Sequence, residues 1–247
     1  EGVFHFAAES HVDRSIDGPQ DFINTNIIGT YNLLEISRKY FTKQTPNFKF
    51  IHVSTDEVYG ESMLNINEQS KTEQSILCPT NPYAATKAGA ELLAQSYNHS
   101  FNMPIIITRG NNVYGPNQYP EKLIPKFIKQ LKNRQQVTIQ GDGSCVRAFL
   151  HSKDPARAFQ TILEKGVIGE IYNIGCDDGM EFSVKDVADI LIKKIIGIEK
   201  EHNSMWIRYI EDRPFNDKRY YISNQKLRDL GWDIKIKFMN GINELIE

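Results

Sequence analysis

Short apolar runs alternate with longer segments of helical periodicity along this chain of 247 residues, and the alternation constrains the fold more than any other feature. The apolar runs predict strands at residues 3–8, 48–53, 104–109, 137–139, 170–174 and 207–210. The segments between them predict helices at residues 19–41, 82–102, 119–132, 154–164, 183–196 and 238–246. Strands that alternate with helices pair in parallel, so we expect an α/β protein with helices layered on a parallel sheet.

The predicted elements become shorter in the later part of the chain. We therefore expect two units, residues 1–115 and residues 116–247, with elements that interleave between them. A polar loop is predicted from residue 55 to residue 81. Pro125 is expected to limit or kink its helix, because proline removes a backbone donor and clashes with the preceding turn.

Charge and cysteine usage exclude several classes of partner. The chain has 29 Lys and Arg residues against 31 Asp and Glu residues and no basic block, so neither nucleic acid nor an anionic membrane is expected to bind. No apolar run approaches the ~20 residues of a membrane span. Cys78, Cys145 and Cys176 lie outside any C-x-x-C pattern, which indicates reduced thiols, a cytoplasmic location and no metal site.

Polar clusters follow the first three predicted strands: "AAESHVDRS", "STDEVYG" and "RGNNVYGP". In open α/β sheets, ligands bind beyond the carboxyl ends of the strands. Any one of these clusters could simply cap a helix or form a turn. Three clusters at successive strand ends instead predict one shared binding crevice.

Tyr83 and Lys87 are four residues apart in "NPYAATKAGAELL" and therefore share one helix face. Free tyrosine has a pKa of ~10 and is a poor base at neutral pH. A nearby ammonium group favours the phenolate and lowers that pKa. The same spacing is also common on ordinary helix surfaces. Small neighbours would let another surface approach closely: Ala84, Ala85, Ala88, Gly89 and Ala90.

A family resemblance extends over nearly the whole chain. The segments "AAESHVDRS", "STDEVYG", "PYAATK", "NNVYGPNQYPEKLIP", "GDGSCVRAF", "YNIG" and "EDRPFNDKRY" occur in the order seen in nucleotide-sugar 4,6-dehydratases of the extended short-chain dehydrogenase/reductase superfamily. Among these the chain most resembles dTDP-glucose 4,6-dehydratases. The resemblance implies a Rossmann-like doubly wound sheet with a smaller C-terminal lobe that binds the nucleotide sugar.

The resemblance also implies a reaction. In this family hydride passes from carbon 4 of the sugar to NAD, water is eliminated across carbons 5 and 6, and hydride returns to carbon 6. By similarity Tyr83 is the oxidation base, Lys87 its electrostatic partner, and Thr55 bonds the carbon-4 oxygen. Asp56 would be the acid and Glu57 the base of the elimination, roles that need pKa values set apart by their environments.

Asp56 separates this chain from relatives. Sugar 4-epimerases typically lack both acids, and decarboxylating or GDP-mannose relatives typically carry Thr-Ser-Glu in place of "TDE". Asp56 therefore favours glucose 4,6-dehydration. The plain alternative is that Asp56 forms a turn and that Glu57 is a solvated surface charge.

The resemblance implies further contacts. The expected cofactor-side residues are Phe6, Ala7, Ala8, Glu9, Thr25, Ser54 and Val113, together with Tyr83 and Lys87. The expected substrate-side residues are Ser10, Thr55, Asn112, Lys122, Leu123, Thr138, Arg147 and Arg213. The three cations suit a diphosphate, although each could also be a solvated charge. Asn216 departs from the family pattern, which often has histidine there.

The glycine-rich turn that binds a dinucleotide pyrophosphate, with its acidic ribose partner, is not found in the sequence. Gly141-Asp142-Gly143 lacks a third glycine and a following helix. We therefore expect Glu1 to correspond to a point inside the first domain of a longer parent. The chain as written would bind NAD poorly and expose an apolar sheet edge.

Relatives in this superfamily commonly form homodimers through two helices, which here are residues 21–41 and 82–102. The apolar positions of these helices could instead pack on the sheet of their own chain. Three alternatives to the dehydratase remain: a UDP-sugar epimerase, a decarboxylase, and a non-catalytic nucleotide-sugar binder. The sequence leaves open whether dTDP or UDP carries the sugar.

Overall fold

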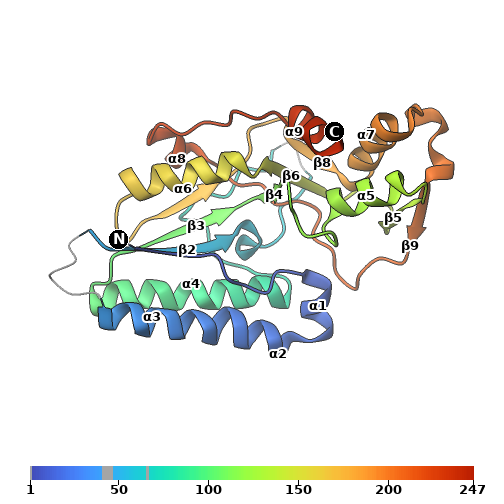
Figure 1. Cartoon of the computed structure of the whole chain (residues 1–247). Helices are drawn as coiled ribbons and strands as arrows, with labels where there is room; N and C mark the ends of the chain where they lie inside the picture. The colour runs from blue at the N-terminus through green and yellow to red at the C-terminus, as the bar shows by residue number, and fades with distance from the viewer. Residues whose placement is uncertain (1, 41–46, 65–66) are drawn as a thin grey trace.

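The computed structural model describes residues 2–40, 47–64 and 67–247. Its largest sheet is parallel, with strand order β1-β2-β3-β7 and helices on both faces (Figure 1). These strands span Gly2–His5, Lys49–Thr55, Ile105–Gly110 and Ile171–Ile174. The predicted α/β class with a parallel sheet is confirmed. Because β7 lies after residue 116, the later part of the chain contributes a strand to the sheet that the earlier part begins.

The central strands are apolar on both faces because helices cover both sides of the sheet. Phe50, Ile105 and Ile107 pack in one cluster with residues of α3 (Gly29–Tyr40) and α4 (Pro82–Phe101). Ile51 and Ile106 pack in a second cluster with residues of α6 (Lys153–Lys165) and α8 (Gln225–Asp229). Neighbouring residues on a strand point to opposite faces, so the continuous apolar runs feed two cores.

The helix predicted at residues 19–41 is more complex in the structure. A short α1 (Val12–Asp17) precedes it, and α2 (Pro19–Phe22) and α3 are joined by the π-helix η1 (Ile23–Ile28). The predicted end, Phe41, lies outside the described residues.

Buried Asn26 lies in this π-helix and joins two parts of the chain. Its amide nitrogen donates to Glu9 O (3.0 Å) and Thr86 Oγ1 (2.9 Å), and its oxygen accepts from Glu9 N (2.9 Å). The segment that leaves β1 is thereby tied to α4, the helix that carries the predicted tyrosine.

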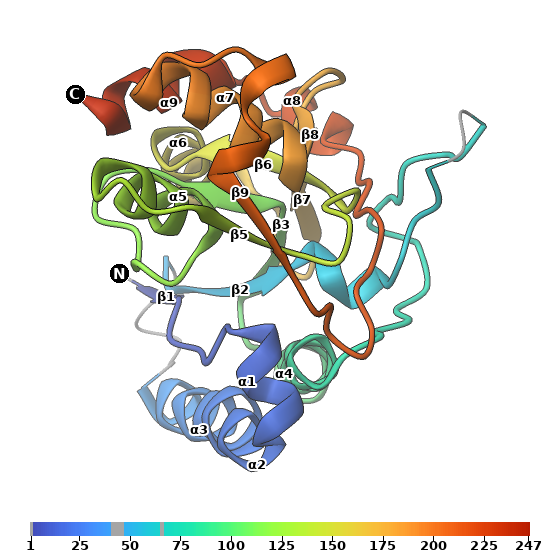
Figure 2. The ribbon, with the colours of Figure 1, turned by 90° about the vertical axis from the view of Figure 1, so that its right-hand side faces the viewer.

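Two smaller sheets form a second lobe. One has the order β4-β6-β8, with strands Asn112–Tyr114, Val146–His151 and Glu181–Ser183. The other pairs β5 (Val137–Gln140) with β9 (Ile207–Ile210). The helices of this lobe are α5 (Leu123–Lys132), α7 (Val184–Ile196) and α9 (Phe238–Ile246). Figure 1 shows the lobe beyond the carboxyl ends of β2 and β3, and Figure 2 shows α5 and β5 on the side of β2 opposite α1 and α4.

Sequence reasoning missed several short elements: α1, β4, β6, β8, α8 and the 3-10 turns η3 (Lys200–His202) and η4 (Ser204–Trp206). Most are too short to show a period. β6 was missed because Arg147 interrupts its apolar run. The arginine faces the cavity described below, where a charged side chain is tolerated.

Pro125 was expected to limit or kink its helix, and in the structure it lies in the first turn of α5 and does not kink it. α5 begins at Leu123, so Pro125 is the third residue of its first turn, where backbone N–H groups have no partner within the helix. The predicted start near residue 119 is wrong, because residues 119–122 form turns before the helix.

Candidate active site

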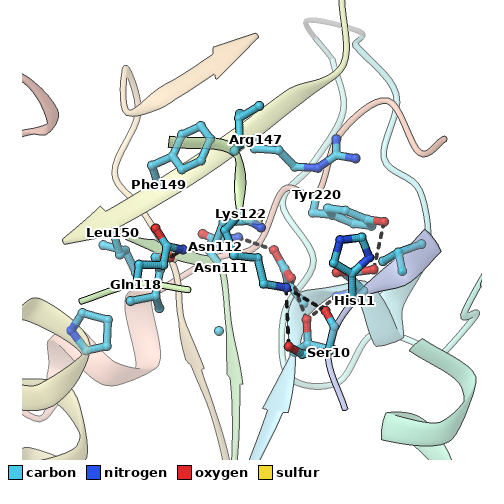
Figure 3. Close-up of a pocket in the computed structure, with 18 of the residues that line it drawn as sticks. Ser10, His11, Asn111, Asn112, Gln118, Lys122, Arg147, Phe149, Leu150 and Tyr220 are labelled. Carbon is cyan, nitrogen blue, oxygen red and sulfur yellow. Dashed lines mark hydrogen bonds between the residues drawn. The ribbon is translucent and has the colours of Figure 1, made fainter. Parts of the chain in front are cut away.

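The carboxyl ends of β1, β2 and β3 open into a cavity of about 1120 Å³ between the large sheet and the second lobe (Figure 3). Most of the predicted site residues line it: Phe6, Ser10, Ser54, Thr55, Asp56, Glu57, Tyr83, Asn112, Val113, Lys122, Leu123, Thr138, Arg147 and Arg213. They come from segments more than 200 residues apart along the chain, as Ser10 and Arg213 illustrate. The crevice predicted from the three strand ends is therefore present.

The other predicted residues do not line the cavity. Ala7, Ala8 and Glu9 lie in the segment between β1 and α1. Ala7 is exposed, and Ala8 and Glu9 are half-buried. Thr25 is exposed on the π-helix. Lys87 is buried behind the cavity wall. Contacts of these residues with a cofactor remain a prediction.

A single 3-10 turn, η2 (Asp56–Tyr59), directs the acid pair into the cavity. Thr55 is its N-cap: its hydroxyl oxygen accepts a hydrogen bond from Glu57 N (3.3 Å), and its hydroxyl donates to Asp56 Oδ1 (3.1 Å). A threonine before two acids is thus explained by local structure, since the cap bends the chain as β2 ends.

Asp56 is almost fully buried, with 2% of its surface exposed. Burial, followed by the neighbouring Glu57 carboxylate, raises the pKa of Asp56 to about 7. A hydrogen bond from Asn111 Nδ2 to Asp56 Oδ2 (2.6 Å) opposes this rise because it favours the ionised form. At neutral pH Asp56 is therefore able to act as a proton donor.

Burial also raises the pKa of Glu57. Asn81 Nδ2 donates to Glu57 Oε2 (3.1 Å), and the phenol oxygen of Tyr220 lies 3.4 Å from the same Oε2. The Asn81 bond and the positive charge of Arg147 oppose the rise in pKa. Glu57 therefore has two polar partners at Oε2, and its side chain also lines the cavity.

Tyr83 also lines the cavity, but its pKa is raised rather than lowered. Burial is the main cause, followed by the carboxylate of Glu57. The expected effect of Lys87 is wrong for this structure: Lys87 Nζ donates to Val53 O (2.7 Å), and burial lowers its own pKa to about 8. The shared helix face brings the two residues into the same region but does not pair them.

The three predicted cations line the part of the cavity formed by the second lobe. Lys122 Nζ donates to Ser10 O (2.9 Å), Arg147 donates to Asp217 O (2.9 Å), and Arg213 donates to Gln140 Oε1 (3.0 Å). These bonds hold each cation at the cavity wall, and cations held at fixed positions suit an anionic ligand.

Sequence reasoning missed several residues that contact the acids or line the cavity: His11, Asn81, Asn111 and Tyr220. Asn81 carried a signal, because an Asn-Pro pair at a helix start marks an N-cap, and its side chain indeed accepts from Ala84 N (2.8 Å). Asn111 lies in the polar cluster "RGNNVYGP", directly before the predicted residue Asn112. Tyr220 ends the family segment "EDRPFNDKRY", but nothing in the sequence indicated its contact with Glu57, which only the tertiary fold brings about.

Two other kinds of site are not found among the residues that the structure describes. No group of three or more His, Cys, Asp or Glu residues could hold a metal ion there. None of the helices in that part of the chain is long and apolar enough to cross a membrane.

The chain was compared with known proteins. It is 48% identical over 245 residues to a trifunctional UDP-glucose 4,6-dehydratase/UDP-4-keto-6-deoxy-D-glucose 3,5-epimerase/UDP-4-keto-L-rhamnose-reductase of Arabidopsis thaliana, which covers 99% of this chain and 35% of that protein. It is 45% identical over 282 residues to the dTDP-D-glucose 4,6-dehydratase of Dictyostelium discoideum, covering 98% of this chain and 62% of that one. The chain thus spans between about a third and two thirds of these relatives.

Among solved structures, the dTDP-glucose 4,6-dehydratase DesIV from Streptomyces venezuelae with NAD and TYD bound superposes with a TM-score of 0.89 at 38% identity. The match covers 100% of this chain and 72% of that chain. The family described as GDP-mannose 4,6 dehydratase matches residues 1–245. The chain therefore belongs to this family of nucleotide-sugar dehydratases, within the extended short-chain dehydrogenase/reductase superfamily.

Proposed function

We propose that the natural protein containing this chain converts a nucleoside-diphosphate glucose to the 4-keto-6-deoxy sugar with the help of NAD. One observation carries the proposal: Asp56 and Glu57 stand side by side in the cavity that Tyr83 also lines. An elimination needs an acid and a base on one sugar ring, and the pKa of about 7 suits Asp56 to the acid role.

The cavity wall has features that fit the nicotinamide end of NAD. Ser54 Oγ and Thr108 Oγ1 are buried, line the cavity, and have no hydrogen-bond partner among the described residues. Such groups are costly unless a ligand satisfies them, as a carboxamide would. Phe6 and Val113 add apolar surface, 56% and 42% exposed. NAD, when bound, would supply a site that takes hydride from carbon 4 and returns it to carbon 6.

For the oxidation, Tyr83 would take the proton of the carbon-4 hydroxyl. Thr55 would hold the same oxygen, because both side chains line the cavity beside the acid pair. The raised pKa of Tyr83 in this structure means that its phenolate needs a further positive charge. Lys87 holds the end of β2 through Val53 O, and we assign it the role of fixing the strand that carries Ser54 and Thr55.

For the elimination, Glu57 would remove the proton from carbon 5, and the electron pair of that C–H bond would pass into the conjugated 4-keto system. The carbon-6 hydroxyl would then leave as water with the proton of Asp56. Glu57 ends protonated and Asp56 ionised. Glu57 returns to its ionised form when it gives its proton to carbon 5, and Asp56 regains a proton from solvent, which also takes up the proton that Tyr83 removed from the carbon-4 hydroxyl. The separate environments of the two acids support these roles.

The substrate would lie with its diphosphate among Lys122, Arg147 and Arg213, since cations held at fixed positions suit two linked phosphates. Ser10 and Asn112 would contact the sugar–phosphate portion. Leu123 and Thr138 would lie near the base. The similar proteins are named for dTDP-glucose and for UDP-glucose, so we propose both carriers as candidates.

The test uses the natural protein that contains this chain, with NAD and either dTDP-glucose or UDP-glucose. Formation of a 4-keto sugar, detected by its absorbance in alkali, is the expected result with at least one substrate. Paired variants Asp56→Asn and Glu57→Gln should lose this product by about 100- to 10,000-fold, the usual contribution of a general acid or base. An epimerised sugar, a released pentose product, or binding without turnover would contradict the dehydratase.

We also propose that the protein is a cytoplasmic homodimer. Cys78, Cys145 and Cys176 are free, as expected in a reducing compartment. The π-helix and α4, which lie side by side, expose Ile28 (48%) and Leu92 (55%). Exposed apolar side chains on two adjacent helices suit contact with the same helices of a second copy.

A further inference from the structure

Two residues from the later part of the chain, to which the family resemblance gives no role, lie next to the proposed base: Tyr220 contacts Glu57, and Asp217 contacts Tyr220. Tyr220 lines the cavity and is 5% exposed, and Asp217 behind it is 3% exposed. Tyr220 OH lies 2.5 Å from Asp217 Oδ2 and 3.4 Å from Glu57 Oε2. Glu57, Tyr220 and Asp217 therefore form a continuous chain of hydrogen-bonding groups.

A phenol has one proton, so it cannot donate fully to both carboxyl groups. The shorter distance assigns that proton to Asp217. The lone pairs of the phenol oxygen then face Glu57. This arrangement is unfavourable for an ionised Glu57, but it provides an acceptor for the O–H group of a protonated Glu57.

The surroundings hold this arrangement in place. Thr80 Oγ1 lies 2.8 Å from both carboxylate oxygens of Asp217. Arg147 donates to Asp217 O (2.9 Å), and its guanidinium lies 4.8 Å from the centre of the Tyr220 ring (Figure 3). Burial raises the pKa of Tyr220, so its proton remains on the phenol.

We propose that Asp217 and Tyr220 are positioning residues for Glu57: Asp217 holds the Tyr220 proton, and the phenol oxygen accepts a hydrogen bond from Glu57 after Glu57 has taken a proton. The identity of that proton, from carbon 5 of the sugar, rests on the proposed function. The pair strengthens Glu57 as a base and keeps the proton next to the carbon to which it returns.

Other groups also face Glu57. Asp56 on η2, Tyr83 on α4, Arg147 on β6 and Lys122 before α5 each interact with it electrostatically. Asn81 Nδ2 donates to the same oxygen, Oε2. A test must therefore remove only the phenol hydroxyl and leave these groups in place.

The sign of one pKa change decides the proposal. In the natural protein with glutamate labelled with carbon-13 at the side-chain carboxyl, Glu57 is titrated by NMR and assigned by the loss of its signal in Glu57→Gln. Tyr220→Phe should lower the pKa of Glu57 by about one unit, since protonated Glu57 loses its acceptor. Asp217→Asn should lower it too, because the phenol proton turns to Glu57 and a negative charge disappears.

Tyr221→Phe is the matched control. The Tyr221 hydroxyl also faces an aspartate, Asp178 Oδ1 at 3.3 Å, but it is not part of the cavity wall. This variant should leave the pKa of Glu57 unchanged. If Tyr220 instead donated to Glu57, Tyr220→Phe would raise that pKa. A raised or unchanged pKa in Tyr220→Phe overturns the proposal, and thermal unfolding checks that each variant is folded.

A second readout separates this proposal from the proposed function. Exchange of the carbon-5 hydrogen with solvent deuterium should slow by about 10- to 100-fold in Tyr220→Phe, with the acid limb of its pH profile moved to lower pH and oxidation at carbon 4 unchanged. If the pKa changes occur as expected but the unaltered protein forms no 4-keto sugar from either substrate, the proposed function fails while the hydrogen-bond assignment stands.

Discussion

Burial places the pKa of Asp56 in the range where a carboxyl group can donate a proton at neutral pH. Its pKa of about 7 stands well above the ordinary 3.8 because the carboxyl is buried next to Glu57. As an acid in the elimination it must carry a proton. We expect the elimination rate to fall as the pH rises through about 7. The measurement is single-turnover formation of the 4-keto-6-deoxy sugar over a range of pH, and a rate that rises through this range would contradict the acid role.

The same shift makes a prediction about stability. The folded form binds the Asp56 proton more tightly than the unfolded chain does, so the free energy of unfolding falls as the pH rises from about 4 to about 7. Asp56→Asn removes this cost and should stabilise the fold above pH 7 by up to roughly 4 kcal/mol, with little gain in acid. Denaturant unfolding at both pH values checks this. An equal gain at both would point to packing instead of ionisation.

At the scale of elements, the start of α4 joins stability to chemistry. The Asn81 side chain caps this helix and also donates to Glu57 Oε2. Asn81→Ala should cost about 1 kcal/mol as a lost cap, raise the pKa of Glu57, and move the acid limb of the elimination to higher pH. Ser183→Ala, which removes the cap of α7 in the other lobe, should cost a similar amount and leave the pH profile unchanged. Identical pH profiles in both variants would contradict the link.

A buried ion pair joins α4 to β3. Arg109 and Glu91 are 3% and 0% exposed, and Arg109 also donates to Tyr59 OH (2.6 Å). Removing one partner leaves a buried charge without compensation, so Glu91→Gln should destabilise the fold by about 3–5 kcal/mol. The exposed pair of Lys193 and Glu199 is the control, and Glu199→Gln should leave the melting temperature unchanged. A small effect of Glu91→Gln would show that water reaches the pair.

At the scale of the whole molecule, the proposed dimer follows from the exposed apolar positions on the π-helix and α4. Leu92→Arg places a charge on that surface and should convert the dimer to a monomer, because an unpaired charge is not tolerated in an apolar interface. Light scattering of the natural protein and the variant at micromolar concentration measures this. A control substitution, Ile76→Arg, changes an 86% exposed side chain outside these helices and should leave the mass unchanged.

The sequence predicted secondary structure better than it predicted contacts between residues far apart along the chain. Local patterns were sufficient for the strands β1, β2, β3, β7 and β9, for the α4 boundaries and for α9, because apolar runs and helix caps leave signals within a few residues. The order of motifs placed Thr55, Asp56, Glu57 and Tyr83 in one site, and the cavity contains all of them.

Side-chain partners across the chain were decided by the tertiary structure alone. It set Lys87 against Val53 O rather than against a phenolate, and chose Asn111 as the donor to Asp56. It also brought Tyr220, 163 residues away in sequence, to Glu57. A sequence pattern determines the face on which a side chain lies. Its hydrogen-bond partner depends on how separate elements pack, and its pKa depends on how much water that packing excludes.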